Sequence, residues 1–118
     1  MHRPARKPNE LEQLFVERAN GGDIEGLLAL YEQDATIVSE DGTLSVGKDQ
    51  IRTFLVQFLA DCPRLGPSAQ APAVRNRDLA LTSSRLVNGG MTAEVARRQA
   101  DGNWLWVIDV FSISRAGG

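Results

Sequence analysis

The spacing of the apolar residues changes part-way along the chain, and this change limits the possible folds more than any other sequence feature. Up to residue 60, apolar residues recur every three or four positions, which is the spacing of one face of a helix. Beyond residue 72, apolar and β-branched residues form short runs separated by turn residues, as in strands. Helices that precede the strands, instead of alternating with them, predict an α+β fold.

Three helices and a small hairpin are expected in the first half. Gly21-Gly22 stops the first helix, because glycine adopts the left-handed C-terminal conformation at little cost. Asp23 then caps the second helix, and Asp41-Gly42 makes a turn between two short strands. The expected elements are a helix over 9–20, a helix from Asp23 to about Tyr31, strands over 35–39 and 44–46, and a helix over 49–60.

A loop and a run of strands are expected in the second half. Three prolines and a glycine break the segment from Cys62 to Pro72. Four strands follow it, over residues 73–77, 79–87, 91–99 and 104–113. Their sheet must cover its apolar face, and the helices are the available cover. We therefore expect a cone-shaped fold, with three N-terminal helices packed against a strongly bent antiparallel sheet and a pocket inside.

The length of 118 residues suits one domain. We expect it to span 9–114, with 1–8 as a disordered basic tail and 115–118 as a second tail. The net charge of −2 gives no electrostatic footprint for nucleic acid or for an anionic membrane surface. No apolar run is long enough to span a membrane, so neither partner is expected.

The chain has one cysteine and one histidine, and this scarcity excludes several kinds of chemistry. Cys62 has no partner for a disulfide bond, and His2 lies in the N-terminal tail. Zinc sites built from these residues and histidine-dependent triads are therefore not expected. No glycine-rich phosphate loop is present either. The sequence implies no cofactor and no metal, and its cysteine usage suits a cytoplasmic protein.

Several segments resemble the nuclear-transport-factor-2-like superfamily. The last of them is similar to a bacterial branch that contains ketosteroid-isomerase homologues and SnoaL-like, polyketide-cyclase-like proteins. The resemblance covers about residues 10–113 and implies the cone fold. It implies no particular chemistry, because the superfamily hosts enzymes, binders and transport adaptors alike. The segments are Asn20–Asp23, Leu27–Tyr31, Asp34–Thr36, Gly47 with Ile51, Arg52 and Phe54, and Arg97–Trp104 with Val107–Asp109.

The resemblance also allows a test for steroid-isomerase chemistry, which uses an aspartate base, a tyrosine and a protonated aspartate. Aligned on the shared segments, the tyrosine position falls on Phe15, which has no hydroxyl group. The base position falls on Ser39, which cannot abstract a proton unaided at neutral pH. A shift of one residue would offer Glu40, but it would turn that side chain to the other face of the strand. The isomerase reaction is therefore disfavoured.

The final hairpin places two carboxyl groups opposite each other. If Asp101-Gly102 is a two-residue turn, Gln99 pairs with Trp104, and Glu94 pairs with Asp109 further along. Opposite residues of neighbouring strands share a face, with Cβ atoms about 5 Å apart. In a pocket, repulsion and desolvation would raise one of the two pKa values. Asp109 is then the candidate base and Glu94 the candidate acid; alternatively, the pair is solvated and has no chemical role.

Which face of this hairpin lines the pocket is left open by the sequence. Hydrophobicity alone would turn the tryptophan face inward, whereas the family resemblance turns the carboxylate face inward. On the second alternative, Trp104, Trp106 and Arg97 lie outside and form a homodimer interface. The expected ligand-binding residues are Phe15, Tyr31, Ser39, Phe54, Ala96, Arg98, Val107 and Phe111.

Three functions are consistent with these features. The first is a small-molecule pocket protein that takes a small apolar or carboxylated ligand. The second is a cofactor-free acid/base enzyme, such as an isomerase, cyclase or hydratase, that uses Glu94 and Asp109. The third is a dimeric protein-interaction module whose sheet face is the functional surface.

Overall fold

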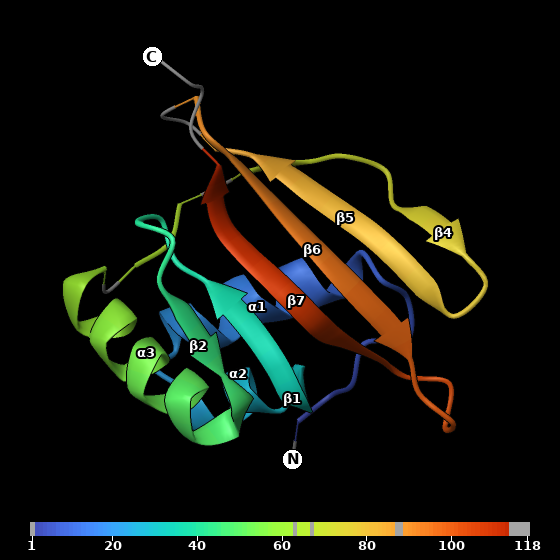
Figure 1. The fold of residues 1–118 in the computed structure, drawn as a ribbon, viewed down its shortest axis with the longest axis horizontal. Coiled ribbons are helices and arrows are strands. Elements are labelled where there is room, and N and C mark those ends of the chain that lie inside the picture. Colours follow the sequence, from blue (N-terminus) through green and yellow to red (C-terminus); the bar gives the residue numbers. More distant parts are fainter. Residues whose placement is uncertain (1, 63, 67, 87–88, 114–118) are drawn as a thin grey trace.

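A computed structural model describes residues 2–62, 64–66, 68–86 and 89–113, and these residues form an α+β fold (Figure 1). The three expected helices and the expected strands are present. The elements in chain order are α1 (Glu10–Asn20), α2 (Ile24–Leu28), β1 (Tyr31–Val38), β2 (Leu44–Val46), α3 (Gly47–Asp61), β3 (Ala69–Gln70), β4 (Val74–Asn76), β5 (Leu79–Arg85), β6 (Met91–Arg98) and β7 (Trp104–Ile113).

All seven strands belong to one sheet, in the order β2-β1-β7-β6-β5-β3, with β4 also paired to β5. Neighbouring strands are antiparallel except β1 and β7, which run parallel. These two strands come from opposite ends of the chain and lie side by side in the centre of Figure 1. The expected cone is thus confirmed, with one parallel pair in a sheet that was expected to be antiparallel.

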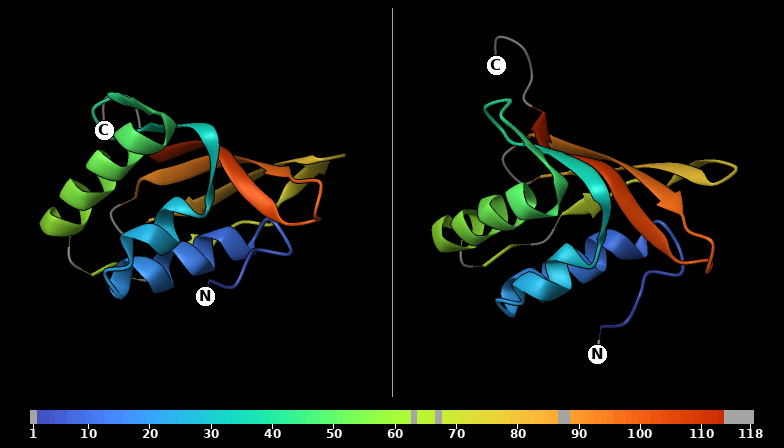
Figure 2. Two further views of the ribbon diagram at one scale, coloured as in Figure 1. Left: turned by 90° about the horizontal axis from the view of Figure 1, so that it is seen from below. Right: turned by 60° about the horizontal axis from the view of Figure 1, so that its bottom comes forward.

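The helices cover one face of the bent sheet and leave the other face open (Figure 2). The core lies between these layers and includes Leu11 and Leu14 of α1, Ile51 and Leu55 of α3, and Ile37 of β1. No helix in the described part of the chain is long and apolar enough to cross a membrane.

The second helix is shorter than expected, and Tyr31 belongs to a strand instead. Asp23 caps this helix as predicted, because its side chain accepts a hydrogen bond from the Gly26 N–H at 2.9 Å. The helix then ends at Leu28. The Leu30 carbonyl accepts a hydrogen bond from the Trp106 N–H at 2.8 Å, and Tyr31 pairs with Trp106. Pairing with β7 therefore overrides the helical periodicity of this segment.

The N-terminal segment packs on the domain, which corrects the expectation of a disordered tail. Ala5 is buried and forms a β-bridge with Trp104, whose N–H donates to the Ala5 carbonyl at 2.9 Å. The guanidinium group of Arg18 donates to the Arg3 carbonyl. Backbone pairing thus fixes residues that composition alone assigned to solvent. Met1 and the expected C-terminal tail at 115–118 lie outside the described residues.

The final hairpin has a longer turn than expected. The Gln99 N–H donates to the Asn103 carbonyl at 2.7 Å, so three residues form the loop instead of two. The register beside the turn therefore differs by one residue from the prediction, and Arg97 lies opposite Leu105. A β-bulge then compensates: Ala96 pairs with Trp106 and Val95 with Ile108, which leaves Val107 unpaired.

The bulge changes which side chains of β7 face the helices. Before it, Trp104 and Trp106 point inward and are only 2% and 1% exposed. After it, Asp109 is buried on the same inner side. An extra residue reverses the alternation of a strand, so both groups occupy one face. The two alternatives for this hairpin therefore do not exclude each other, and the placement of the tryptophans in an outer interface is wrong.

Candidate functional site

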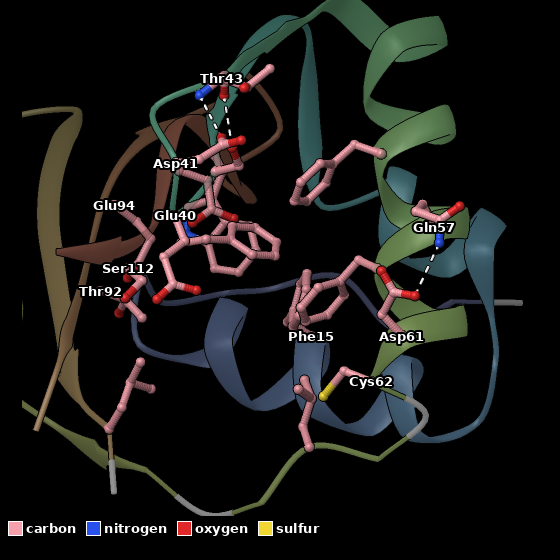
Figure 3. A pocket seen from close by; sticks show the side chains of 18 of the residues that line it. Phe15, Glu40, Asp41, Thr43, Gln57, Asp61, Cys62, Thr92, Glu94 and Ser112 are labelled. Atoms are coloured by element: carbon pink, nitrogen blue, oxygen red, sulfur yellow. Dashed lines mark hydrogen bonds between the residues drawn. The ribbon is translucent and has the colours of Figure 1, made fainter. Parts of the chain in front are cut away.

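A pocket of about 780 Å³ opens between the inner face of the sheet, α1 and α3 (Figure 3). Glu94, Thr92 and Ser112 line it from the sheet side, and Gln57, Asp61 and Cys62 line it from the side of α3 in this view. The turn between β1 and β2 closes one end with Ser39, Glu40, Asp41 and Thr43. A cavity of this volume is within the range of small-molecule sites.

Aromatic rings form one wall of the pocket. The Phe111 ring lies nearly perpendicular to the rings of Phe54 and Phe58, with centroids 5.0 Å apart in each pair. Phe15 approaches Phe111 at 5.8 Å and Trp106 at 5.7 Å. The helical spacing of Phe54 and Phe58 places both on one face of α3, and this face meets β7. The wall offers apolar contacts and ring faces to a bound molecule.

Two buried carboxyl groups lie side by side on the sheet. Glu94 on β6 pairs with Asp109 on β7, as the sequence predicted, and they are 2% and 4% exposed. The Tyr31 hydroxyl donates to Asp109 Oδ2 at 2.5 Å, and the Thr82 hydroxyl donates to Glu94 Oε1 at 2.7 Å. Each carboxyl group thus has one hydroxyl donor and a like charge as its neighbour.

Burial raises the pKa of both carboxyl groups. For Glu94, loss of hydration raises the pKa, and the hydroxyl groups of Thr92 and Thr82 partly oppose this effect. For Asp109, loss of hydration and the neighbouring charge of Glu94 raise the pKa well above its usual range, against the hydrogen bond from Tyr31. Burial, followed by the charge of Asp109, also raises the pKa of Tyr31 well above its usual value. This hydroxyl group stays protonated and acts as a donor.

A third carboxyl group, Glu12 on α1, lines the same pocket and was missed by sequence reasoning. Loss of hydration, followed by the charge of Glu94, raises its pKa to about 7. Glu12 lies three residues before Phe15, on the helix face that packs on the sheet. That spacing was the available sign that Glu12 faces the sheet. However, the helix dipole favours acidic residues in the first turn of any helix, including those that face solvent.

The structure brings most of the predicted site residues together. Phe15, Ser39, Phe54 and Phe111 line the pocket with Glu94 and Asp109, and Tyr31 reaches it through its hydrogen bond to Asp109. The Ser39 hydroxyl is engaged within its own turn, where it bonds to Asp41 and the Thr43 carbonyl.

Three predicted ligand-binding residues lie elsewhere. Ala96 is fully buried in the core, and Val107 is the unpaired residue of the bulge; neither lines the pocket. Arg98 is exposed and forms an ion pair with Asp78 at 2.6 Å. These residues were placed by strict alternation along the hairpin, which the three-residue turn and the bulge interrupt.

The residues lining the pocket do not form a metal centre. Among the described residues, no group of three or more His, Cys, Asp or Glu side chains is arranged to hold a metal ion. The site instead combines an aromatic wall with separate carboxyl groups in different local environments, which suits hydrogen bonding and proton transfer.

Comparison with known protein families identifies the family. The sequence profile described as the SnoaL-like domain matches residues 12–118. The chain belongs to the SnoaL-like family. The match extends over nearly the whole chain, so the helices and the sheet that build the pocket both belong to the SnoaL-like domain.

Solved structures of the same fold accompany the family match. A protein of unknown function with a cystatin-like fold from Nostoc punctiforme superposes with a TM-score of 0.70 at 19% identity, over 86% of this chain and 84% of the other. A ketosteroid isomerase-like protein from Erwinia carotovora atroseptica gives 0.69 at 17% identity, over 91% and 94%. An NTF2-like protein with a cystatin-like fold from Novosphingobium aromaticivorans gives 0.68 at 20% identity, over 92% and 80%. No curated protein is significantly similar in sequence.

Proposed function

We propose that this SnoaL-like protein binds a small, largely apolar molecule in the pocket of its cone. The observation that carries the proposal is the combination of a pocket of about 780 Å³, an aromatic wall and the carboxyl groups of Glu12, Glu94 and Asp109 on its lining. A pocket with mostly apolar walls and a few convergent polar groups is typical of small-molecule sites. The apolar wall supplies affinity, and the carboxyl groups supply orientation and selectivity.

The residues at the isomerase-like positions support binding rather than steroid isomerisation. Phe15 and Ser39 both line the pocket, but neither supplies the phenol or the carboxylate that the resemblance assigns to those positions. The only tyrosine of the chain, Tyr31, donates to a buried aspartate from β1. These side chains support the proposal of binding over isomerisation.

The binding test compares two variants of α3. Phe54→Ala removes a ring from the pocket wall, whereas Val56→Ala removes an exposed side chain two residues away on the same helix. A library of small apolar compounds is screened by thermal shift, since a ligand of the native state raises the melting temperature. Hits should bind about tenfold more weakly to Phe54→Ala than to the wild type, because the variant loses an apolar contact of about 1–2 kcal/mol. They should bind to Val56→Ala as tightly as to the wild type. The proposal would be contradicted if no compound raised the melting temperature, or if both variants lost the same amount of binding affinity.

A second candidate function is cofactor-free acid/base catalysis on the bound molecule. The pKa of Glu12, at about 7, favours it, because a general base works best near the ambient pH. Glu94 and Asp109 then act as proton-bearing partners, as their raised pKa values allow. For ligands with an acidic C–H bond, this function predicts deuterium uptake from D₂O, seen by mass spectrometry and lost in Glu12→Gln. Binding without deuterium uptake would favour a binding protein.

A further inference from the structure

One buried hydrogen-bond donor on the pocket lining has no acceptor in the protein. The Trp106 side chain is 1% exposed, and its indole N–H has no hydrogen-bond acceptor among the described residues. An indole N–H can only donate, and buried polar groups in proteins nearly always have a partner. Because the ring lines the pocket, a molecule bound there can supply the acceptor.

The neighbours of the indole ring explain why the protein supplies no acceptor. The ring centroid of Trp106 lies 5.7 Å from that of Phe15 and 5.2 Å from that of Tyr31. Phe15 has no polar side-chain atom, and the Tyr31 hydroxyl donates to Asp109. On the neighbouring strand, Trp106 pairs with Ala96, whose side chain is apolar. A hydrogen bond formed at such a site is strong, because little water competes for the donor.

The charges around the pocket favour an uncharged acceptor. Burial, followed by the charge of Glu94, raises the pKa of both Glu12 and Asp109, so these three groups lie close together on the lining. A ligand carboxylate beside them would be repelled. Arg64 and Arg85 each precede a leucine of the lining, but both arginines are exposed. They can attract an anion at the surface, whereas the indole N–H is buried.

We propose that the Trp106 indole N–H donates to an uncharged acceptor of the ligand, such as a carbonyl oxygen, while the phenylalanine rings contact the ligand's apolar body. The inference rests on the proposed binding function and specifies its ligand class, which is a neutral apolar molecule with an oxygen acceptor. Of the two ligand types expected from the sequence, it keeps the apolar one and rejects the carboxylate. The indole nitrogen is covered by its neighbours, so lining side chains must move slightly as the ligand binds.

The experiment uses three probes with the same bicyclic body: tetralin, 1-tetralone and tetralin-1-carboxylate. At one ring position they carry no polar group, a carbonyl oxygen and a carboxylate group, respectively. Dissociation constants are measured by isothermal titration calorimetry on the full chain at neutral pH. We expect 1-tetralone to bind at least as tightly as tetralin, because the hydrogen bond from Trp106 replaces the hydration that the carbonyl group loses. Tetralin-1-carboxylate should bind most weakly.

The indole N–H signals in the NMR spectrum report this hydrogen bond directly. The chain has two tryptophans, so nitrogen-15-labelled protein gives two indole N–H signals. The loss of one signal in a tryptophan variant assigns both. A new hydrogen bond moves the proton signal downfield, so the Trp106 signal should lie further downfield in the 1-tetralone complex than in the tetralin complex. Both probes bring the same aromatic ring, which controls for ring-current effects.

Two matched variants test the assigned donor. Trp106→Phe keeps an aromatic ring on the lining but removes the N–H, and Trp104→Phe makes the same change at a buried position of β7 outside this pocket. Trp106→Phe should lower the affinity for 1-tetralone about tenfold more than the affinity for tetralin, the effect of one hydrogen bond. Trp104→Phe should leave the ratio of the two affinities unchanged. If Trp106→Phe does not fold, Trp104→Phe assigns the signals and the wild-type spectra decide.

The outcomes separate this inference from the proposed function. If tetralin or tetralin-1-carboxylate binds more tightly than 1-tetralone, the inference is wrong while the pocket function stands. The same Trp106 signal in the 1-tetralone and tetralin complexes, or equal losses of affinity for both probes in Trp106→Phe, would also overturn it. If none of the three probes binds, although other apolar compounds raise the melting temperature, the inference alone fails. If no compound of any class binds, both fail.

Discussion

At the scale of single residues, burial raises the pKa values of three carboxyl groups that line the pocket. Glu94 and Asp109 lie in the sheet and each accept a hydrogen bond from a hydroxyl group. Glu12 differs from them, since no hydrogen bond to its side chain is present among the described residues and its pKa lies at about 7. A side chain in this state can accept, donate or release a proton at physiological pH. The free energy of folding must therefore depend on its protonation.

Replacing Glu12 with glutamine should stabilise the protein at neutral and alkaline pH. The pKa of Glu12 rises from 4.5 in the reference state to about 7 in the folded protein. Its protonated form therefore favours folding at low pH, and this contribution is lost as the pH rises from about 4.5 to 7. Glutamine does not titrate, so the variant does not lose stability over this pH interval. The advantage of Glu12→Gln should grow over this interval and reach a plateau of about 3 kcal/mol above pH 7.

Urea denaturation at pH 5, 6, 7 and 8 measures this difference in the free energy of unfolding. Glu17→Gln on the same helix controls for the general effect of changing glutamate to glutamine. A difference between Glu12→Gln and the wild type that stays constant from pH 5 to pH 8 would contradict the assigned burial of Glu12.

At the scale of the elements, the bulge in β7 decides which side chains enter the pocket. Trp106 before the bulge and Asp109 after it are three positions apart, yet both face the helices. In an uninterrupted strand, residues separated by an odd number of positions point to opposite faces. The unpaired Val107 therefore lets one strand supply part of both the core and the site.

Deletion of Val107 should remove the bulge and leave Asp109 on the inner face of the sheet. Ala96 pairs with Trp106, Val95 with Ile108 and Glu94 with Asp109, so without Val107 these pairs follow one another directly and each side chain keeps its face. Far-UV circular dichroism should therefore show a cooperative melting transition for the deletion variant. Val107→Ala keeps the backbone length and should retain the transition with a loss of about 1 kcal/mol. Loss of the cooperative transition in the deletion variant alone would show that the fold requires the bulge itself.

At the scale of the whole molecule, the open face of the sheet remains apolar. Leu81, Val95 and Ile108 lie in register across β5, β6 and β7, and Leu81 and Ile108 are 49% and 41% exposed. Contiguous exposed apolar side chains are typical of interaction surfaces. The homodimer that the sequence suggested stays a prediction, and on this face Leu81 and Ile108 are exposed whereas Trp104 and Trp106 are buried within the protomer.

Ile108→Lys should therefore dissociate a homodimer that forms through this face, since a buried lysine charge opposes association. Val56→Lys places the same change at an exposed position of α3 and should leave the assembly unchanged. Sedimentation velocity reports the oligomeric state. A wild-type dimer that persists in Ile108→Lys would exclude this face as the interface. A monomeric wild type would leave the stripe free for a different protein, as an interaction module requires.

Much of the fold could be predicted from the sequence, because local patterns fix it. The apolar stripe of α1, the cap at Asp23 and the turn at Asp41-Gly42 depend on neighbours within a few residues. The pairing of Glu94 with Asp109 was also predicted, although through two errors that cancelled. The assumed turn was one residue too short, and the bulge restored the register before the carboxyl groups.

By itself, the sequence determined the fold class, the positions of the helices and the presence of acidic and aromatic residues for a pocket. Only the tertiary structure decided which residues meet there. Glu12 joins the pocket because α1 packs on the sheet, Tyr31 becomes a donor because β1 pairs with β7, and Ala5 is buried because it pairs with Trp104. Each of these contacts joins segments far apart in the chain. Local periodicity cannot specify such contacts, because they depend on how the bent sheet closes over the helices.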